Sequence, residues 1–167
     1  MDGIVLVAYA SKHGSTREVA DAICESLHRA GLRAHLRPAA DVDDLEGYGA
    51  VVLGAPIYMG RWHRHAHRFL RRHEKNLTDR PLAVFALGPV SEEASDWRQS
   101  REHLDAALAR HEVDPVRVEM FGGKVDPAQL LFPFSHLKGG DYRDWNAVAA
   151  WAAGLPAALG IRSPLLV

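Results

Sequence analysis

The stretch Ile4-Val5-Leu6-Val7-Ala8-Tyr9-Ala10, followed directly by Ser11-Lys12-His13-Gly14-Ser15-Thr16, indicates the fold of this chain. A nearly continuous apolar run bounded by turn residues is typical of a strand buried on both faces, as at the centre of a parallel sheet. A helix is predicted to follow at once, with Ser15 or Thr16 as its cap. Its buried face would consist of apolar side chains at helical spacing: Val19, Ala20, Ile23, Cys24 and Leu27.

The loop between this strand and this helix has the composition of an anion site. Its hydroxyls and amides would lie at the positive end of the helix dipole, where a phosphate meets unpaired donors and favourable charge. The loop lacks the glycines of the G-x-G-x-x-G dinucleotide motif and the G-x-x-x-x-G-K-[ST] of nucleoside triphosphatases. An ordinary strand-to-helix turn explains the same hexapeptide about equally well. The rest of the chain must therefore decide between the two interpretations.

Strands and helices alternate along the remaining sequence. The pattern predicts an edge strand over 33–37, buried strands over 50–54 and 82–87, a last strand over 115–121, and helices over 62–75, 95–110 and 144–159. Such alternation favours an α/β fold with a parallel sheet and helices on both faces. Ligands of these sheets bind at the carboxyl ends of the strands. The candidate loops are therefore residues 11–16, 55–61 and 88–93.

Length and composition indicate a single domain spanning residues 1–167, with nearly half of its residues apolar. The 20 basic and 21 acidic residues give a formal net charge of −1, which does not favour nucleic acid as a partner. The lone cysteine, Cys24, is expected to be a small buried side chain. No targeting pattern and no apolar stretch of membrane-spanning length is evident, so we expect a cytoplasmic protein.

With the three loops in place, the chain resembles the flavodoxin family, and more closely the flavodoxin-like protoporphyrinogen IX dehydrogenases. Residues 11–16 look like the phosphate loop of the family, and Gly54-Ala55-Pro56-Ile57-Tyr58-Met59-Gly60 looks like the loop that covers one side of the flavin ring. The C-terminal part is similar too. Phe121-Gly122-Gly123-Lys124 follows the last strand, and Tyr142-Arg143-Asp144-Trp145 precedes the final helix.

This resemblance implies a flavodoxin-like three-layer sandwich with a five-stranded parallel sheet of order 2-1-3-4-5, holding FMN without a covalent bond. Hydroxyls and amides of residues 11–16 would donate to the phosphate, and Tyr58 offers a face for stacking. Gly60 tolerates positive φ and would let the peptide after Met59 turn over when the flavin gains a proton. The implied cofactor-binding residues are Ser11, Lys12, His13, Gly14, Ser15, Thr16, Pro56, Ile57, Tyr58, Met59, Gly60, Leu87, Gly88, Pro89, Val90 and Ser91.

The sequence departs from the electron-carrying flavodoxins at two points. His13 stands where many of them have a threonine, which leaves another flavin-like cofactor open. Arg61, Trp62, His63 and Arg64 follow the glycine where those carriers usually show acidic residues. A cation near the reduced flavin stabilises its anionic form, so we expect a less reducing flavin than in a low-potential carrier.

Three further features keep alternatives open. The basic helix over 61–75 is expected to pack its apolar side on the sheet, or else to dock an acidic substrate or an anionic membrane surface. His63 and His67 have the spacing of a metal pair, yet we interpret them as solvent-facing histidines, with no metal site. The connector over 122–140 contains Leu130-Leu131-Phe132-Pro133-Phe134. It is expected to return to the core, to cover the site, or to form a dimer or membrane contact. Trp145 and Trp151 are expected to pack.

The function we expect is that of an FMN-dependent oxidoreductase, in which the flavin accepts electrons from an organic substrate and passes them to a quinone or another acceptor. Its partner would be a small-molecule redox substrate. The alternative is a flavodoxin-type electron carrier that docks to redox proteins. No side chain is identified as a general acid or base.

Overall fold

The structure, a computed structural model, describes residues 3–129 and 138–163. The main strands are β1 (Ile4–Tyr9), β2 (Ala34–Pro38), β3 (Tyr48–Tyr58), β5 (Leu82–Leu87) and β6 (Arg117–Phe121). The helices are α1 (Ser15–Arg29), α2 (Arg64–Leu77), α3 (Ala94–Leu108) and α4 (Trp145–Ala158). Short elements complete the description: 3-10 helices η1 (Ala39–Asp41) and η2 (Pro127–Gln129), and strands β4 (Arg61–Trp62), β7 (Lys124–Val125) and β8 (Gly140–Asp141).

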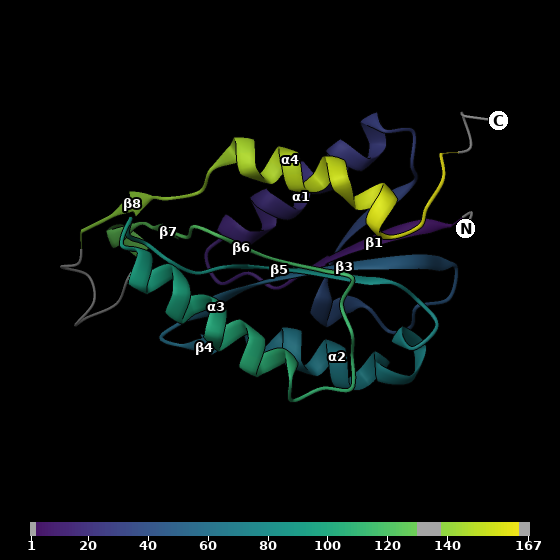
Figure 1. The fold of residues 1–167 in the computed structure, drawn as a ribbon, viewed down its shortest axis with the longest axis horizontal. Coiled ribbons are helices and arrows are strands. Elements are labelled where there is room, and N and C mark those ends of the chain that lie inside the picture. The colour runs from purple at the N-terminus through teal and green to yellow at the C-terminus, as the bar shows by residue number, and fades with distance from the viewer. Residues whose placement is uncertain (1–2, 130–137, 164–167) are drawn as a thin grey trace.

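The five main strands form a parallel sheet of order β2-β1-β3-β5-β6, which confirms the predicted order 2-1-3-4-5. Helices α1 and α4 cover one face of the sheet, while α2 and α3 cover the other (Figure 1). Two pairings were not expected from the sequence: β4 runs antiparallel to the end of β3, and β7 pairs with β8. The first pairing lies at the carboxyl end of β3 and the second follows the carboxyl end of β6, the edge where ligands of such sheets bind.

The core consists of one apolar cluster on each face of the sheet. Val5 and Val7 of β1 join the cluster beneath α1 and α4, while Leu6 and Ala8 join the one beneath α2 and α3. Successive strand side chains point to opposite faces, so an unbroken apolar run fills both clusters at once. Cys24 is buried in the first cluster, as expected, and burial raises the pKa of its thiol.

The basic helix packs its apolar side on the sheet as predicted, but it begins two residues later than expected. Trp62 pairs with Ile57 in the β3–β4 hairpin, and its indole N–H donates to the carbonyl of Ala55 at 3.2 Å. That buried bond holds Trp62 in a strand, so α2 starts at Arg64. Its buried side consists of Ala66, Phe69, Leu70, His73 and Leu77.

The two tryptophans of the final helix differ in burial. Trp151 is buried, but Trp145 is 42% exposed, so its expected packing is wrong. It sits at the start of α4, where its ring lies 4.8 Å from the Arg143 guanidinium. Residues 130–134, whose role was left open, lie outside the described residues. Within the described ranges, no helix is both long and apolar enough to span a bilayer.

Candidate functional site

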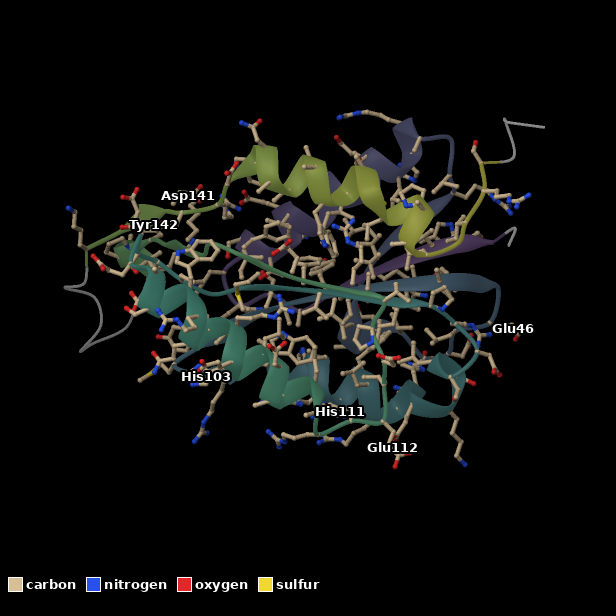
Figure 2. The ribbon with its side chains drawn as sticks, viewed as in Figure 1. Glu46, His103, His111, Glu112, Asp141 and Tyr142 are labelled. Atoms are coloured by element: carbon tan, nitrogen blue, oxygen red, sulfur yellow. The ribbon has the colours of Figure 1, made fainter. Side chains whose placement is uncertain are left out.

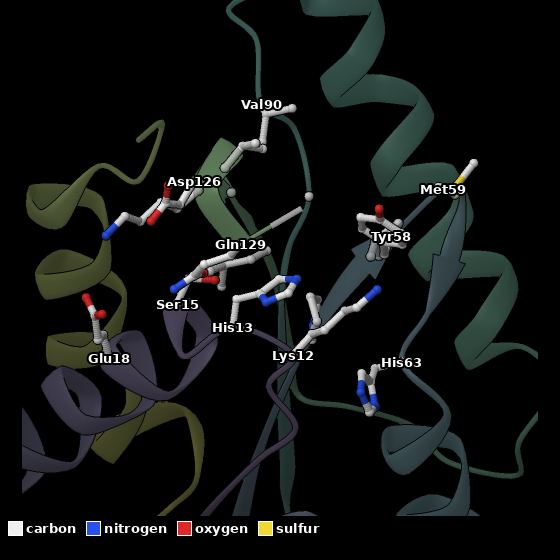
Figure 3. Close-up of a pocket in the computed structure, with 17 residues that line it drawn as sticks. Lys12, His13, Ser15, Glu18, Tyr58, Met59, His63, Val90, Asp126 and Gln129 are labelled. Atoms are coloured by element: carbon white, nitrogen blue, oxygen red, sulfur yellow. The ribbon is translucent and has the colours of Figure 1, made fainter. Parts of the chain in front are cut away.

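A cavity of about 390 Å³ opens at the carboxyl end of the sheet, between the ends of β1, β3 and β5 and the segment after β6 (Figure 3). Figure 2 marks this end of the molecule by Asp141 and Tyr142, while Glu46 lies at the other end. The volume is within the roughly 300–1,000 Å³ typical of small-molecule sites. The lining residues are Lys12, His13, Ser15, Glu18, Pro56, Ile57, Tyr58, Met59, His63, Leu87, Gly88, Val90, Gly123, Lys124, Val125, Asp126 and Gln129.

The first turn of α1 meets the cavity with unpaired donors. Its N-cap is Gly14, in a left-handed conformation with φ 87°, and no side chain caps the helix. The expected cap by Ser15 or Thr16 is therefore wrong. Without a side-chain cap, the first amides of α1 have no acceptor within the helix. Such a helix start attracts anions through these amides and the helix dipole.

The three hydroxyls expected around a phosphate lie in different positions. Ser15 lines the cavity. Ser11 Oγ accepts the Gly14 N–H at 2.9 Å, which closes the turn before the helix. Thr16 is 1% exposed, and its Oγ1 is a buried hydroxyl without a hydrogen-bond partner among the described residues. Of these three residues, only Ser15 lines the cavity. Thr16, the next residue in the chain, carries a buried hydroxyl that could still donate a hydrogen bond.

The hairpin between β3 and β4 forms a second wall. Tyr58 is 41% exposed, and Lys12 Nζ lies 4.3 Å from the centre of its ring. Met59, at φ 50°, and Gly60, at φ 74°, both adopt left-handed backbone conformations. Met59 is a non-glycine residue in this region, which is uncommon and often marks a functional turn. An aromatic face and a strained turn therefore lie at the cavity edge.

His63 lines the cavity, although the sequence alone indicated a solvent-facing side chain. Its ring is half-buried, and Nδ1 accepts the His65 N–H at 3.1 Å, which caps α2. Neutral His63 must then carry its proton on Nε2. Burial, followed by the positive charges of His65, Arg64 and Lys12, lowers the pKa of His63. We expect a neutral donor here at neutral pH.

His67, the second residue of the suggested pair, is also not a solvent-facing side chain. Its Nδ1 lies 2.8 Å from Nε2 of His111, which follows α3 (Figure 2). Among the described residues, no group of three or more potential ligands is arranged to hold a metal ion. The histidine bond ties α2 to the end of α3 and lies outside the cavity lining.

The end of β5 contributes Leu87 to the cavity, and the loop after it contributes Gly88 and Val90, but not Pro89 or Ser91. Ser91 turns toward α3 instead: its hydroxyl donates to the Asp96 carboxylate, and its carbonyl accepts the Trp97 indole N–H at 3.0 Å. Ser91 thus fixes the loop to α3 and does not line the cavity.

The segment after β6 forms the third wall. A side chain at Gly122 would place its Cβ 1.9 Å from the carbonyl oxygen of Tyr142. Gly123 donates its N–H to the carbonyl of Pro89 at 2.7 Å, and its own carbonyl accepts the N–H of Tyr142 at 2.9 Å. These backbone contacts hold the following residues against the cavity. The Phe-Gly-Gly-Lys stretch contributed to the family resemblance, but the sequence did not show that its residues line the cavity.

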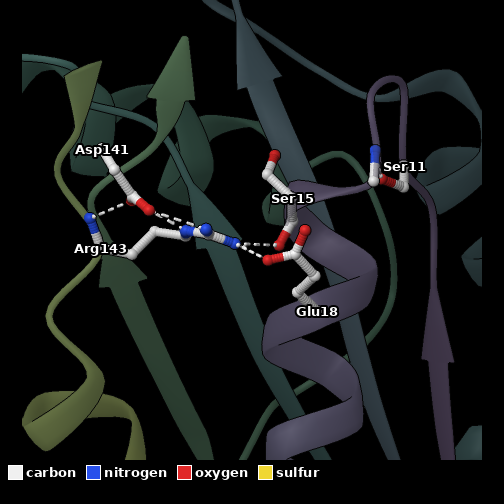
Figure 4. Close-up of polar contacts among 6 residues, drawn as sticks. Ser11, Ser15, Glu18, Asp141 and Arg143 are labelled. Carbon is white, nitrogen blue, oxygen red and sulfur yellow. Dashed lines mark hydrogen bonds and ion pairs between the residues drawn. The ribbon is translucent and has the colours of Figure 1, made fainter. Parts of the chain in front are cut away.

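Arg143 fastens this wall to α1 (Figure 4). Its side chain is 3% exposed and forms ion pairs with Asp141 at 2.8 Å and Glu18 at 3.0 Å. Nη1 also donates to the carbonyl of Ser15 at 3.2 Å. The hydrogen bond from Arg143 holds the pKa of the Asp141 carboxyl below its usual value. Two cavity-lining residues of α1, Ser15 and Glu18, thus share one cation.

The structure therefore brings most of the predicted residues to one cavity. Those outside its lining are Ser11, Gly14, Thr16, Gly60, Pro89 and Ser91, each of which adjoins a lining residue. The lining residues that the sequence did not indicate are Glu18, His63, Gly123, Lys124, Val125, Asp126 and Gln129.

The fold and the position of the cavity define a doubly wound α/β protein with a cavity at the carboxyl edge of its sheet, where such folds bind their ligands. Residues 6–133 match the flavodoxin domain, and the chain belongs to this family. It is similar to protoporphyrinogen IX dehydrogenase [quinone] of Escherichia coli K12, with 23% identity, covering 88% of this chain and 91% of the relative.

Solved structures share the fold. Oxidised flavodoxin 2 from Bacillus cereus superposes with a TM-score of 0.59 and 19% identity, over 95% of this chain and 97% of that one. A mutant of the flavodoxin from Pseudomonas aeruginosa gives a TM-score of 0.61 and 21% identity, over 94% of this chain and 99% of that one. These likenesses show the fold, and the cavity must be interpreted from its own residues.

Proposed function

We propose that the chain binds FMN in this cavity and is an FMN-dependent oxidoreductase. The observation that carries the proposal is the uncapped start of α1 beside an aromatic wall, within one cavity of suitable size. A dianionic phosphate fits the unpaired amides and the Ser15 hydroxyl, and the orphaned hydroxyl of Thr16 also suits an anion nearby. The planar ring system of a flavin fits the face of Tyr58.

The chain's own residues would bind and orient the cofactor. FMN would supply the redox chemistry, accepting electrons from an organic substrate and passing them to a quinone or another acceptor. Lys12 and neutral His63 present donors at the hairpin wall. Among the described residues, no side chain is assigned as a general acid or base. The name of the Escherichia coli relative supports a porphyrinogen-like substrate and a quinone acceptor.

The cofactor is tested on the purified chain. We expect a yellow protein whose released ligand has the mass of FMN, or an apoprotein that binds added FMN stoichiometrically. A colourless chain that refuses FMN, while far-ultraviolet circular dichroism shows it folded, would refute the proposal. Binding of a different flavin, preferred over FMN, would favour the alternative cofactor.

A second candidate is an electron carrier that docks to redox proteins. It is favoured by the exposure of Met59, at 71%, and of Tyr58 beside the cavity, because a partner could approach the cofactor there. Turnover of protoporphyrinogen with a quinone separates the candidates. Multiple turnovers by the holoprotein would support the enzyme, whereas no turnover together with rapid reduction by a flavodoxin reductase would support the carrier.

A further inference from the structure

The buried guanidinium of Arg143 lies between the segment after β6 and the first turn of α1 (Figure 4). We propose that Arg143 is a positioning residue for the cofactor phosphate: it pairs with Glu18, which offsets part of the negative charge of that carboxylate, and it holds the first turn of α1 in place for an anion. The inference rests on the proposed FMN site and concerns which residue makes that site able to accept a dianion.

The negative charge of Glu18 opposes the binding of an anion in the cavity. Its carboxylate lies in the first turn of α1, where a negative charge is favourable to the helix dipole. However, Glu18 and Ser15 line the same cavity, so the carboxylate would repel a bound phosphate. Asp126 adds a second carboxylate to the lining. The anion site therefore needs a nearby cation that is held in place.

Arg143 supplies that cation with fixed geometry. Its Nε and Nη2 donate to the two oxygens of Asp141 at 2.9 and 2.8 Å, which leaves Nη1 for Glu18 and the Ser15 carbonyl. With two nitrogens fixed on Asp141, the third cannot swing away from α1. Because the guanidinium is 3% exposed, solvent screens its charge much less than that of a surface arginine. Lys124 is a basic lining residue on this wall, but it is exposed.

The contact to the Ser15 carbonyl adds a second effect. It ties the cavity-lining residue of the first turn to the wall that contains Gly123, although these segments are far apart in sequence. The amides of that turn are then presented in one orientation before the ligand arrives, which lowers the ordering cost of binding. A lysine at 143 would keep the charge, but its single nitrogen could not reproduce the fork of Arg143, which donates to both Asp141 oxygens and to α1 from separate nitrogens.

The test compares FMN with riboflavin, which lacks the phosphate, in binding to the apoprotein. We expect Arg143→Met to weaken FMN binding about tenfold, in line with a partly buried charge at a helix start, and to leave riboflavin affinity nearly unchanged. Removing the opposing carboxylate in Glu18→Gln/Arg143→Met should recover most of the lost FMN affinity. Arg29→Met, which breaks the exposed ion pair with Glu25 at the far end of α1, is the matched control and should change neither ligand.

The outcomes separate this role from a purely structural one. An equal loss for FMN and riboflavin, or no recovery in the double variant, would overturn the inference while leaving the FMN site intact. If Arg143→Met does not fold, the FMN affinities of Glu18→Gln and Arg143→Lys test the inference instead. The first should bind FMN at least as tightly as wild type and the second more weakly, and the reverse order would overturn the inference. A folded wild-type chain that binds neither flavin would refute the proposed function itself.

Discussion

Gly60 shows how a single residue shapes the hairpin wall of the site. Its φ of 74° lies in the left-handed region, directly after Met59 at 50°. A Cβ at this position would also lie 3.1 Å from Cε1 of His103 on α3. Two successive residues of positive φ turn the chain sharply from β3 into β4, and only the glycine does so without strain.

We predict that Gly60→Ala lowers the free energy of unfolding by about 1–2 kcal/mol, the usual cost of a left-handed conformation for a residue with a Cβ. Urea unfolding of the apoprotein measures this change. Gly60→Asn is the matched control and should lose less, because asparagine tolerates this region. An alanine variant as stable as wild type would show that the hairpin relaxes into another turn.

At Ser15, we predict that substitution by aspartate abolishes retention of FMN. The new carboxylate would face the proposed phosphate from the first turn of α1, and like charges repel strongly at close range. Co-purified flavin and the dissociation constant for added FMN measure the effect. Ser26→Asp, on the last turns of the same helix, gives the same charge change far from the cavity. Unchanged affinity in Ser15→Asp would mean that the phosphate binds elsewhere.

At the scale of elements, β4 and the start of α2 carry basic residues next to the cavity. Arg61 and Arg64 are exposed, and between them Trp62 and His63 turn inward to the core and the cavity. The positive charge of Arg64 already lowers the pKa of His63, after the larger effect of burial, so it acts across the wall of the site.

We predict that Arg64→Glu makes the bound flavin more reducing, by roughly 30 mV, which corresponds to about 1.4 kcal/mol for two electrons. The substitution replaces a charge that stabilises an anionic reduced flavin by one that opposes it. Spectroelectrochemical titration of the holoprotein measures the midpoint potential. Lys75→Glu, near the other end of α2, makes the same charge change and should shift it much less. Equal shifts in both variants would contradict a local effect.

At the scale of the whole molecule, histidines join elements that are distant in sequence. His67 contacts His111 after α3, and buried His73 bonds to the carbonyl of Val42 at 3.2 Å. Burial is the largest cause that lowers the pKa values of His67, His73 and His111, as it is for His63 and His65. These side chains are therefore neutral in the fold over a wider pH range than in the unfolded chain.

From this we predict that acid destabilises the protein. As the pH falls through 6.5, the ordinary histidine pKa, the unfolded chain takes up protons before the folded one does. The free energy of unfolding should thus be highest above pH 6.5 and decrease between that value and the lowered pKa values. Urea midpoints measured from neutral to mildly acidic pH report it. His73→Gln keeps a donor for Val42 and should flatten the dependence, whereas a midpoint that rises on acidification would contradict the prediction.

Much of the fold could be predicted from sequence because the information is local. The apolar runs of β1, β3 and β5 are continuous, so each signals burial on both faces without knowledge of its neighbours. The boundaries that failed depend on partners across the chain. Trp62 is a strand residue because its indole finds the Ala55 carbonyl, and helical spacing alone could not reveal that bond.

In the candidate site, too, some features follow from local sequence and others depend on distant contacts. The sequence by itself determined the α/β class, the strand order implied by the family resemblance, and the loops after β1, β3 and β5 that reach the cavity, because hydrophobic periodicity and turn residues are properties of single segments. Only the tertiary structure decided that Glu18, His63 and the residues after Gly122 complete the lining, and that Arg143 joins them to α1. The physical reason is distance along the chain: an ion pair between residues 18 and 143 exists only after the sheet has brought their elements together.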